Sequence, residues 1–337
     1  MPSVDIENRH HLIEYLLNHN FLTRDQKVRM EILKGGVSNK TVLLQFTDQS
    51  DWVLKQALEK LRVPGDWYSK PERVHREAEA MKWFEKYAPP NTVPKLIFED
   101  QQHHLLGMEA IDPPFQNLKD LLLAEEPHKD YFVQAGTLLG SIHRSALENQ
   151  QELPELFQDD HFFHTLRIEP YYVECVKAVP KSATFFKELI KETKEGKFTL
   201  VHGDFSPKNL LVKDDKLILL DHEVIHFGDG TFDLGFFITH LLSKAHHIPN
   251  HRDSFLIAAL DFYRSYATKV QLTLTQQKRV VRHTIGCCLA RVCGLSQLEY
   301  LTADEREKQK IICLSLIQDE PDSVENLLTA FKELINE

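Results

Sequence analysis

The sequence predicts an α+β fold in two lobes, and three observations support this prediction. Short apolar runs separated by turn residues fill the stretch from Glu31 to Leu61, which is typical of antiparallel strands. The proline-containing segment Ile111–Phe115 then interrupts the chain as a stiff linker. Beyond it, apolar residues recur mainly at helical spacing. We therefore expect an antiparallel sheet lobe with one helix at residues 1–110 and a mainly helical lobe at residues 111–337.

Length and composition agree with two lobes and exclude several classes of protein. The chain has 337 residues, of which 42% are hydrophobic, so it can bury a large core. Its 50 acidic and 40 basic residues give a net charge of −10, which argues against nucleic acid as a partner. No apolar run is long enough to span a membrane, and the polar N-terminus is unlike a secretion signal. The sequence therefore predicts a cytoplasmic protein without a membrane partner.

The first lobe is predicted to begin with a helix over Arg9–Leu17, followed by strands on either side of a glycine pair. The segment Ser69–Glu72 has the pattern of a capping box, with a proline inside the first helical turn. The helix that it opens is expected to end near Tyr87, before two consecutive prolines. Two further strands, Lys95–Glu99 and His104–Glu109, complete this lobe.

The second lobe is predicted to be helical except for one short region. Asp130–Ser145 carries apolar residues at helical spacing, and Phe232–Glu337 is helical almost throughout. Between them, Thr199–Asp221 is predicted to form a strand, a polar turn and a two-stranded hairpin. The five cysteines lack the paired spacing of a zinc site, so we expect reduced and mostly buried thiols.

The polar turn after the first of these strands contains the strongest chemical signal. His202, Asp204 and Asn209 follow the pattern H-x-D, four residues, N, and Asp221 ends an apolar strand twelve residues further on. Phosphoryl transfer needs a base near the acceptor hydroxyl, oxygen ligands for Mg²⁺ and a cation on the phosphates. Asp204 can act as the base, and Asn209 and Asp221 can hold the metal through oxygen atoms.

This segment resembles the catalytic loop of the aminoglycoside phosphotransferase/choline kinase family, small-molecule relatives of the protein kinases. The resemblance implies a protein-kinase-like two-lobed fold that binds ATP and Mg²⁺ in the cleft between its lobes. It also requires a strand lysine that binds the α and β phosphates, and Lys55 lies in such a strand. The partner carboxylate should lie on the following helix, where Glu77 shares the apolar face with Val74 and Met81.

Two further segments match the family in chain order. The glycine pair Gly35-Gly36 lies between two strands, and the resemblance implies that Ser38 and Asn39 contact the β and γ phosphates. Leu106–Ile111 is similar to the segment that binds adenine in kinases. There the resemblance implies that the Glu109 carbonyl and the Ile111 N–H face the base, with Met108 behind it.

Simpler interpretations stay open for several of these residues. Asp204 and Asn209 could cap a turn, and Lys55 could be a surface lysine at a sheet edge. Glu223 is either a third metal ligand or a loop hydrogen-bonding residue, and Lys208 either contacts the γ phosphate or points to solvent. His202 is interpreted as a support for the loop.

The resemblance predicts an enzyme that transfers the γ-phosphate of ATP to a hydroxyl of a small molecule such as an aminoglycoside, choline or methylthioribose. Residues 157–172 and 236–251 are expected to line the acceptor pocket. Asp159, Asp160 and Glu169 within or beside the first of these segments would suit an amine-bearing acceptor, and a solvated acidic surface is the alternative interpretation. A pseudokinase that binds nucleotide without transfer is the alternative function. A protein kinase is disfavoured, because no activation segment ending in A-P-E follows Asp221. The oligomeric state stays open.

Overall fold

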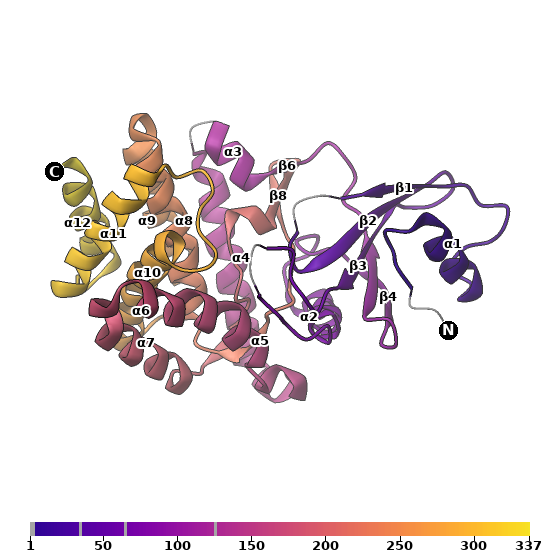
Figure 1. Cartoon of the computed structure of the whole chain (residues 1–337), viewed down its shortest axis with the longest axis horizontal. Helices are drawn as coiled ribbons and strands as arrows, with labels where there is room; N and C mark the ends of the chain where they lie inside the picture. Colours follow the sequence, from indigo (N-terminus) through magenta and orange to yellow (C-terminus); the bar gives the residue numbers. More distant parts are fainter. Residues whose placement is uncertain (1–3, 34–35, 64–65, 125–126) are drawn as a thin grey trace. The chain divides into compact units, whose positions relative to one another are not determined.

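The computed structural model describes residues 4–33, 36–63, 66–124 and 127–337. The chain divides into two compact units, one made of Met1–Lys86 with Val93–Phe115 and the other of Tyr87–Thr92 with Gln116–Glu337. Figure 1 labels most of the elements of the two units. The first unit contains α1 (Arg9–Asn18), β1 (Val28–Ile32), β2 (Asn39–Phe46), β3 (Trp52–Ala57), α2 (Arg73–Tyr87), β4 (Leu96–Asp100) and β5 (Leu105–Glu109).

The strands of the first unit form a five-stranded sheet in the order β1-β2-β3-β5-β4. Every neighbouring pair is antiparallel, so the predicted antiparallel meander is confirmed. In the register of β3, Lys55 lies opposite Thr41 of β2 and Leu106 of β5. Lys55 is therefore on a central strand, and the interpretation of a lysine at a sheet edge is wrong.

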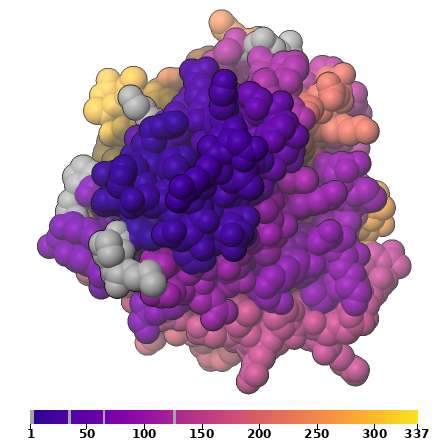
Figure 2. Space-filling model, turned by 90° about the vertical axis from the view of Figure 1, so that its right-hand side faces the viewer, coloured from indigo at the N-terminus to yellow at the C-terminus, as the bar shows by residue number. Residues whose placement is uncertain are grey.

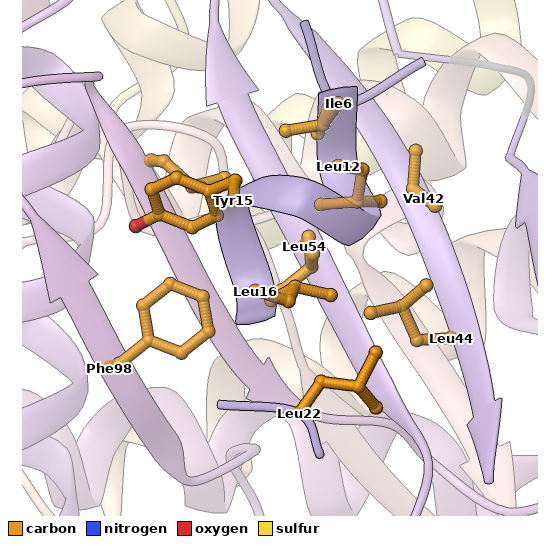
Figure 3. Packing of buried hydrophobic residues seen from close by; sticks show 10 residues of the cluster. Ile6, Leu12, Tyr15, Leu16, Leu22, Val42, Leu44, Leu54 and Phe98 are labelled. Carbon is orange, nitrogen blue, oxygen red and sulfur yellow. The ribbon is translucent and has the colours of Figure 1, made fainter. Parts of the chain in front are cut away.

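Each face of this sheet is covered by one helix. Leu12, Tyr15 and Leu16 of α1 pack with Leu54 and Phe98 of the sheet in a cluster of buried side chains, as Figure 3 shows. Side chains alternate along a strand, so the neighbours of Leu54 point to the opposite face. There α2 packs its buried residues against β3, β4 and β5. The helix predicted at Arg9–Leu17 is α1, and the helix predicted to end near Tyr87 is α2. The described residues of this unit therefore contain two α-helices, and the expectation of one helix in the lobe is wrong. Figure 2 shows the first unit, in indigo and violet, from the side of its N-terminal residues.

The predicted capping box at Ser69 is wrong, because α2 begins four residues later, at Arg73. The Ser69 carbonyl instead accepts a hydrogen bond from the Arg73 guanidinium at 2.9 Å. The same guanidinium donates to the carbonyls of Lys70, Leu58 and Ser38. The buried Arg73 side chain thus donates hydrogen bonds to backbone carbonyl oxygens from three segments of the chain. The residues directly before it form a turn and are not part of the helix.

The described residues of the second unit contain two short β-sheets among many helices. Its strands pair as β10 with β7 and as β6-β8-β9, and the second group includes the predicted hairpin. The strands are β6 (Gln116–Asn117), β7 (Thr199–Val201), β8 (Leu210–Lys213), β9 (Lys216–Leu219) and β10 (His226–Gly228). The α-helices are α3 (Leu118–Ala124), α4 (Lys129–Glu148), α5 (His161–Phe163), α6 (Glu174–Ala178), α7 (Ala183–Glu195), α8 (Thr231–His247), α9 (Arg252–Ala267), α10 (Leu274–Cys293), α11 (Ala303–Gln318) and α12 (Val324–Asn336). A π-helix, His164–Val173, lies between α5 and α6.

The core of the second unit is built around α8, which packs against α9 and α10 (Figure 1). A helix that is apolar on most of its faces is buried in a larger core, and nearly every residue of α8 is buried. Close packing also joins α4 to α9, where a Cβ at Gly136 would lie 2.2 Å from the Phe262 carbonyl oxygen. Within the described ranges, no helix is both long and apolar enough to cross a membrane.

Candidate functional site

In the first unit, the sheet and α2 bring Lys55 and Glu77 into an ion pair. Lys55 Nζ lies 2.7 Å from Glu77 Oε1, and the two side chains are 12% and 1% exposed. The lysine comes from the face of β3 against which α2 packs its buried residues. Helical spacing places Glu77 on that packed face beside Val74, Ala78 and Met81, all of which are buried. The predicted pairing of these two residues is therefore present.

The loop between β1 and β2 is only partly described, because Gly35 lies outside the described residues. Gly36 is exposed, and a Cβ there would meet only the Asn39 carbonyl oxygen, at 3.9 Å. Ser38 and Asn39 are buried, and the Asn39 amide nitrogen donates to Ser38 Oγ at 3.1 Å. The Ser38 carbonyl is tied to Arg73 and to the Leu58 N–H. In this structure the side chains of Ser38 and Asn39 are therefore turned to their neighbours.

The predicted adenine-binding segment lies at the end of β5. Met108 is buried among the side chains that join the sheet to α2. The Glu109 N–H donates to the Lys95 carbonyl, and the Ala110 N–H donates to the Asp51 carbonyl, at 2.9 and 2.8 Å. These bonds fix the backbone on both sides of the Glu109 carbonyl, and Ile111 follows directly.

In the second unit, the loop from His202 to Asn209 is held from behind by α8. Asp233, fully buried, accepts the N–H groups of His202 and Gly203 at 2.7 and 2.8 Å. Gly203 adopts φ +76°, and a Cβ there would approach Val224 within 2.9 Å, so this position requires glycine. The His202 ring accepts the Asp204 N–H at 3.2 Å. His202 therefore supports the loop, as predicted.

The carboxylate of Asp204 is surrounded by donors. Its Oδ1 lies 3.0 Å from Arg167, and its Oδ2 lies 3.2 Å from Lys208 and accepts the Asn209 amide at 2.8 Å. Burial disfavours the charged form, but the Arg167 and Lys208 charges outweigh it and hold the pKa of Asp204 below its ordinary value. The carboxylate is therefore ionised at neutral pH, as a hydrogen-bond acceptor for a hydroxyl must be.

The β8–β9 hairpin places the backbone of Asn209 beside that of Leu220. Leu210 pairs with Leu219, and the Leu220 N–H donates to the Asn209 carbonyl at 2.9 Å, so Asp221 follows directly across from Asn209. Both amide hydrogen bonds of Asn209 go to Asp204, and its amide oxygen is the atom left to face a cation. Asp221 adopts φ +69°, and Glu223 is buried two residues later. One amide and two carboxylate oxygens suit Mg²⁺.

Arg167 was not identified from the sequence, although it makes the closest charged contact to Asp204. It belongs to the π-helix and is 8% exposed. Its Nε donates to the Gly203 carbonyl at 2.6 Å, so it binds both the backbone and the carboxylate of the loop. The sequence offered one signal for Arg167, its place among aromatic and aliphatic residues. An arginine that is buried among such residues needs a hydrogen-bonding or acidic partner.

The acidic residues of the predicted acceptor segment are engaged locally. Asp160 faces Lys197 at 3.8 Å, Glu169 lies 3.1 Å from His164, and Asp159 accepts the His161 N–H. These surface pairings do not support the prediction of an amine-bearing acceptor. In the described part of the chain, no group of three or more histidine, cysteine or acidic residues has the arrangement of a metal site.

Arg167 also contacts two aromatic rings. Its guanidinium stands 5.8 and 6.0 Å from the ring centres of Tyr171 and Phe236. Arg291 of α10 donates to the Tyr171 hydroxyl at 3.2 Å. The Phe236 ring contacts His240, one turn further along α8, at 5.0 Å between centroids.

Comparison with known proteins identifies relatives of the chain. The model of the phosphotransferase enzyme family matches residues 29–268. Methylthioribose kinase 2 of Oryza sativa subsp. japonica is 25% identical over an alignment of 228 positions that covers 60% of this chain and 53% of that protein. Methylthioribose kinase of Citrobacter koseri is 22% identical over an alignment of 365 positions that covers 90% of this chain and 92% of that protein. The chain spans about half the length of the two rice methylthioribose kinases, each matched over 53% of its length.

Solved structures show the same fold at low sequence identity. An amicoumacin kinase superposes with a TM-score of 0.60 at 14% identity, covering 94% of this chain and 96% of that one. A choline kinase from Cryptosporidium parvum superposes with a TM-score of 0.56 at 12% identity, covering 96% and 100%. The protein-kinase-like α+β fold and the family resemblance, both predicted from the motifs, are confirmed.

Proposed function

Since the chain belongs to the phosphotransferase enzyme family, we propose that it is a small-molecule kinase that transfers the γ-phosphoryl group of ATP to a hydroxyl. Lys55, oriented by Glu77, binds the α and β phosphates. The backbone at Gly35 and Gly36, with Ser38 and Asn39, covers the phosphates. The Glu109 carbonyl and the Ile111 N–H bind adenine, in front of the Met108 side chain.

Mg²⁺ is held by Asn209 and Asp221, with Glu223 as a further ligand. The ion neutralises charge on the β and γ phosphates when it is bound. Oxygen donors from one amide and two carboxylates are the set that this ion prefers. The amide nitrogen of Asn209 is engaged by Asp204, which orients the amide oxygen for a cation.

Asp204 orients the acceptor hydroxyl and receives its proton. The hydroxyl oxygen forms a bond to the γ phosphorus while the bond from that phosphorus to the β–γ bridging oxygen breaks, and ADP leaves. The low pKa of Asp204 makes it a weak base, which suits a transition state in which the proton moves late. Arg167 and Lys208 keep the carboxylate in position for this role.

One observation carries this proposal more than any other. A single residue, Asn209, donates to the Asp204 carboxylate while its backbone is bonded to Leu220, next to Asp221. The group proposed as base and the group proposed as metal ligand are thus joined through one side chain and one backbone bond. A turn cap would not need this second carboxylate.

The acceptor is proposed to be a small molecule with an alcohol group, since the relatives named above are methylthioribose, choline and amicoumacin kinases. The proposed compartment is the cytoplasm, where reduced thiols such as the five free cysteines persist. The alternative function, nucleotide binding without transfer, is disfavoured because Lys55, Asp204, Asn209 and Asp221 all carry the groups that transfer requires.

The test is Mg²⁺-dependent ADP release across a panel of hydroxyl compounds. Asp204→Asn should lower turnover by about a hundred-fold or more, since it removes the base while leaving a similar shape. Asp214→Asn is the matched control, because Asp214 is exposed in the hairpin turn and its φ of +48° suits asparagine. Turnover that is equal in the two variants would refute the role of Asp204. ATP binding without ADP release from any acceptor would favour the alternative function.

A further inference from the structure

Three side chains of the second unit place buried polar atoms together without hydrogen-bond partners. Within the part of the chain that the structure describes, Lys244 Nζ, His240 Nε2 and the Tyr300 hydroxyl are buried and have none. Lys244 Nζ stands 5.1 Å from the centre of the Tyr300 ring. His240 precedes Lys244 by four residues on α8, so the two share a face of that helix.

Arg291 completes this group, which we call the basic cluster (His240, Lys244, Arg291 and Tyr300). Arg291 is 8% exposed and donates to the Tyr171 hydroxyl and to Ser296, which are neutral partners. Among the described residues, neither Arg291 nor the fully buried Lys244 has a carboxylate within ion-pair distance. A buried cation without a counter-charge is costly, and proteins normally provide one.

The electrostatics of the cluster agree with its geometry. Burial lowers the pKa of Lys244 to about 7. The charges of Lys119 and Arg291 act in the same direction, and the smaller effects of Glu299 and Asp120 oppose them. Burial also lowers the pKa of His240, and the charges of Arg291, Lys244, Lys208 and Lys119 lower it further. The larger charge effects on both groups are therefore those of cations, and a bound anion would offset them.

The basic cluster is connected to the proposed base through direct contacts. Asp204 binds Arg167, which lies over the rings of Tyr171 and Phe236. Tyr171 is bonded to Arg291, and Phe236 contacts His240. Both segments expected to line the acceptor pocket, residues 157–172 and 236–251, contribute to this connection. The Lys208 side chain is half exposed to solvent. The Lys208 carbonyl accepts a hydrogen bond from the Asn117 amide, and Lys119 follows Asn117 by two residues.

We propose that the acceptor carries an anionic group, a carboxylate or a phosphate, and that the basic cluster binds this group while Asp204 receives the acceptor hydroxyl. This inference rests on the proposed kinase function and names the chemical class of its acceptor. Lys244 and Arg291 supply the positive charge, and His240 and the Tyr300 hydroxyl supply further hydrogen bonds. Neutral alcohols and amines would leave the two cations without a counter-charge.

The first test compares acceptors that differ only in charge. ADP release is measured with neutral sugars, amino sugars, sugar acids and sugar phosphates of the same carbon skeleton. An anionic acceptor should have the highest kcat/KM. Comparison of the sugar acids with the sugar phosphates then shows whether the anionic group is a carboxylate or a phosphate. A neutral or amine-bearing acceptor with the highest kcat/KM would overturn the proposal and leave the kinase function intact.

The second test uses Lys244→Met, which keeps the length of the side chain and removes its charge. It should raise KM for the anionic acceptor roughly ten- to hundred-fold and leave KM for ATP unchanged. Without ligand the variant should be at least as thermostable as the parent, because the buried amine has no partner to lose. The matched control is Lys187→Met, at an exposed position of α7. An unchanged acceptor KM in Lys244→Met would overturn the proposal.

A third measurement separates this inference from the kinase function. If no acceptor releases ADP, the proposed function fails, and the anion site is then tested with inorganic phosphate alone. Phosphate should raise the Tm of the parent and of Lys187→Met but not that of Lys244→Met. Equal stabilisation of the three proteins would overturn the anion site.

Discussion

The ion pair between Lys55 and Glu77 shows how a buried charge depends on its partner. Glu77 is 1% exposed, so its charge has little contact with water and relies on the lysine 2.7 Å away. Removing one partner of such a pair leaves a buried charge uncompensated, whereas replacing both by apolar residues of similar size is often nearly neutral. Stability and phosphate binding can therefore be separated at this position.

Lys55→Met should lower the free energy of unfolding by about 3 kcal/mol or more, because Glu77 is left charged and buried. The double variant Lys55→Met/Glu77→Met should recover most of that loss. Neither variant should support phosphoryl transfer, because the cation on the phosphates is absent from both. Urea unfolding gives the stabilities, and ADP release gives the activities. Recovery of turnover in the double variant would contradict the role given to Lys55.

Local spacing predicted the candidate residues that lie near each other in the chain or repeat on one face. The pattern from His202 to Asn209 is one loop, and Glu77 was selected among three glutamates by its place on the apolar face of α2. Arg167, in contrast, meets Asp204 only through the tertiary fold. Its contact is long-range in sequence, and nothing in the spacing of either residue indicates the other.

The first helix is joined to the β4–β5 hairpin through one carboxylate. Asp100 accepts the Tyr15 hydroxyl at 2.6 Å and lies 2.9 Å from the His103 ring. Burial opposes ionisation, but these hydrogen bonds lower the pKa of Asp100 from 3.8 to about 2. The interaction therefore stabilises the fold fully above pH 3.8 and is lost as the pH falls through 2.

Tyr15→Phe should lower the free energy of unfolding by about 2 kcal/mol at neutral pH, since a hydrogen bond to a partly buried carboxylate is lost. The ring still packs in the core, so the effect is confined to the hydroxyl. The difference from the parent should shrink as the pH falls from 3.8 to 2. The carboxylate of the variant gains its proton at a higher pH than that of the folded parent, which gains it near pH 2. Tyr68→Phe, at a position 55% exposed, is the control. A difference that stays constant down to pH 2 would contradict the contribution given to this hydrogen bond.

The elements were predicted well where a periodic pattern decided them and poorly where a remote side chain did. The strands of the first unit and the long helices follow their apolar patterns closely. The start of α2 does not follow its capping pattern, because Arg73 binds carbonyls from Ser38 and Leu58, more than ten residues away in the chain. The π-helix at His164–Val173, with its internal proline, has no periodic signal of its own.

Taken as a whole, the molecule is a two-unit chain whose proposed ligand is MgATP. A ligand that binds only the folded state stabilises it in proportion to the logarithm of its concentration. At one hundred times its Kd, MgATP should raise the free energy of unfolding by about 2.7 kcal/mol. Most of that increase should disappear when EDTA removes the metal, because the triphosphate then lacks its counter-charge at Asp221 and Asn209.

Asp221→Asn supplies the variant for this measurement. The φ of +69° at this position suits asparagine, so the backbone is expected to keep its conformation. Thermal unfolding with ATP should then show no difference between samples with and without Mg²⁺. A metal-dependent stabilisation that persists in Asp221→Asn would show that the metal is held elsewhere.

The most direct test of the central claim is the ³¹P NMR spectrum of a reaction that contains ATP, Mg²⁺ and the best acceptor of the panel. We expect one new phosphate monoester for each ADP formed, and formation of both products about a hundred-fold or more slower with Asp204→Asn. ADP that accumulates with inorganic phosphate and without an ester, or a spectrum that is the same with Asp204→Asn, would contradict the claim that this chain is a small-molecule kinase with Asp204 as its base.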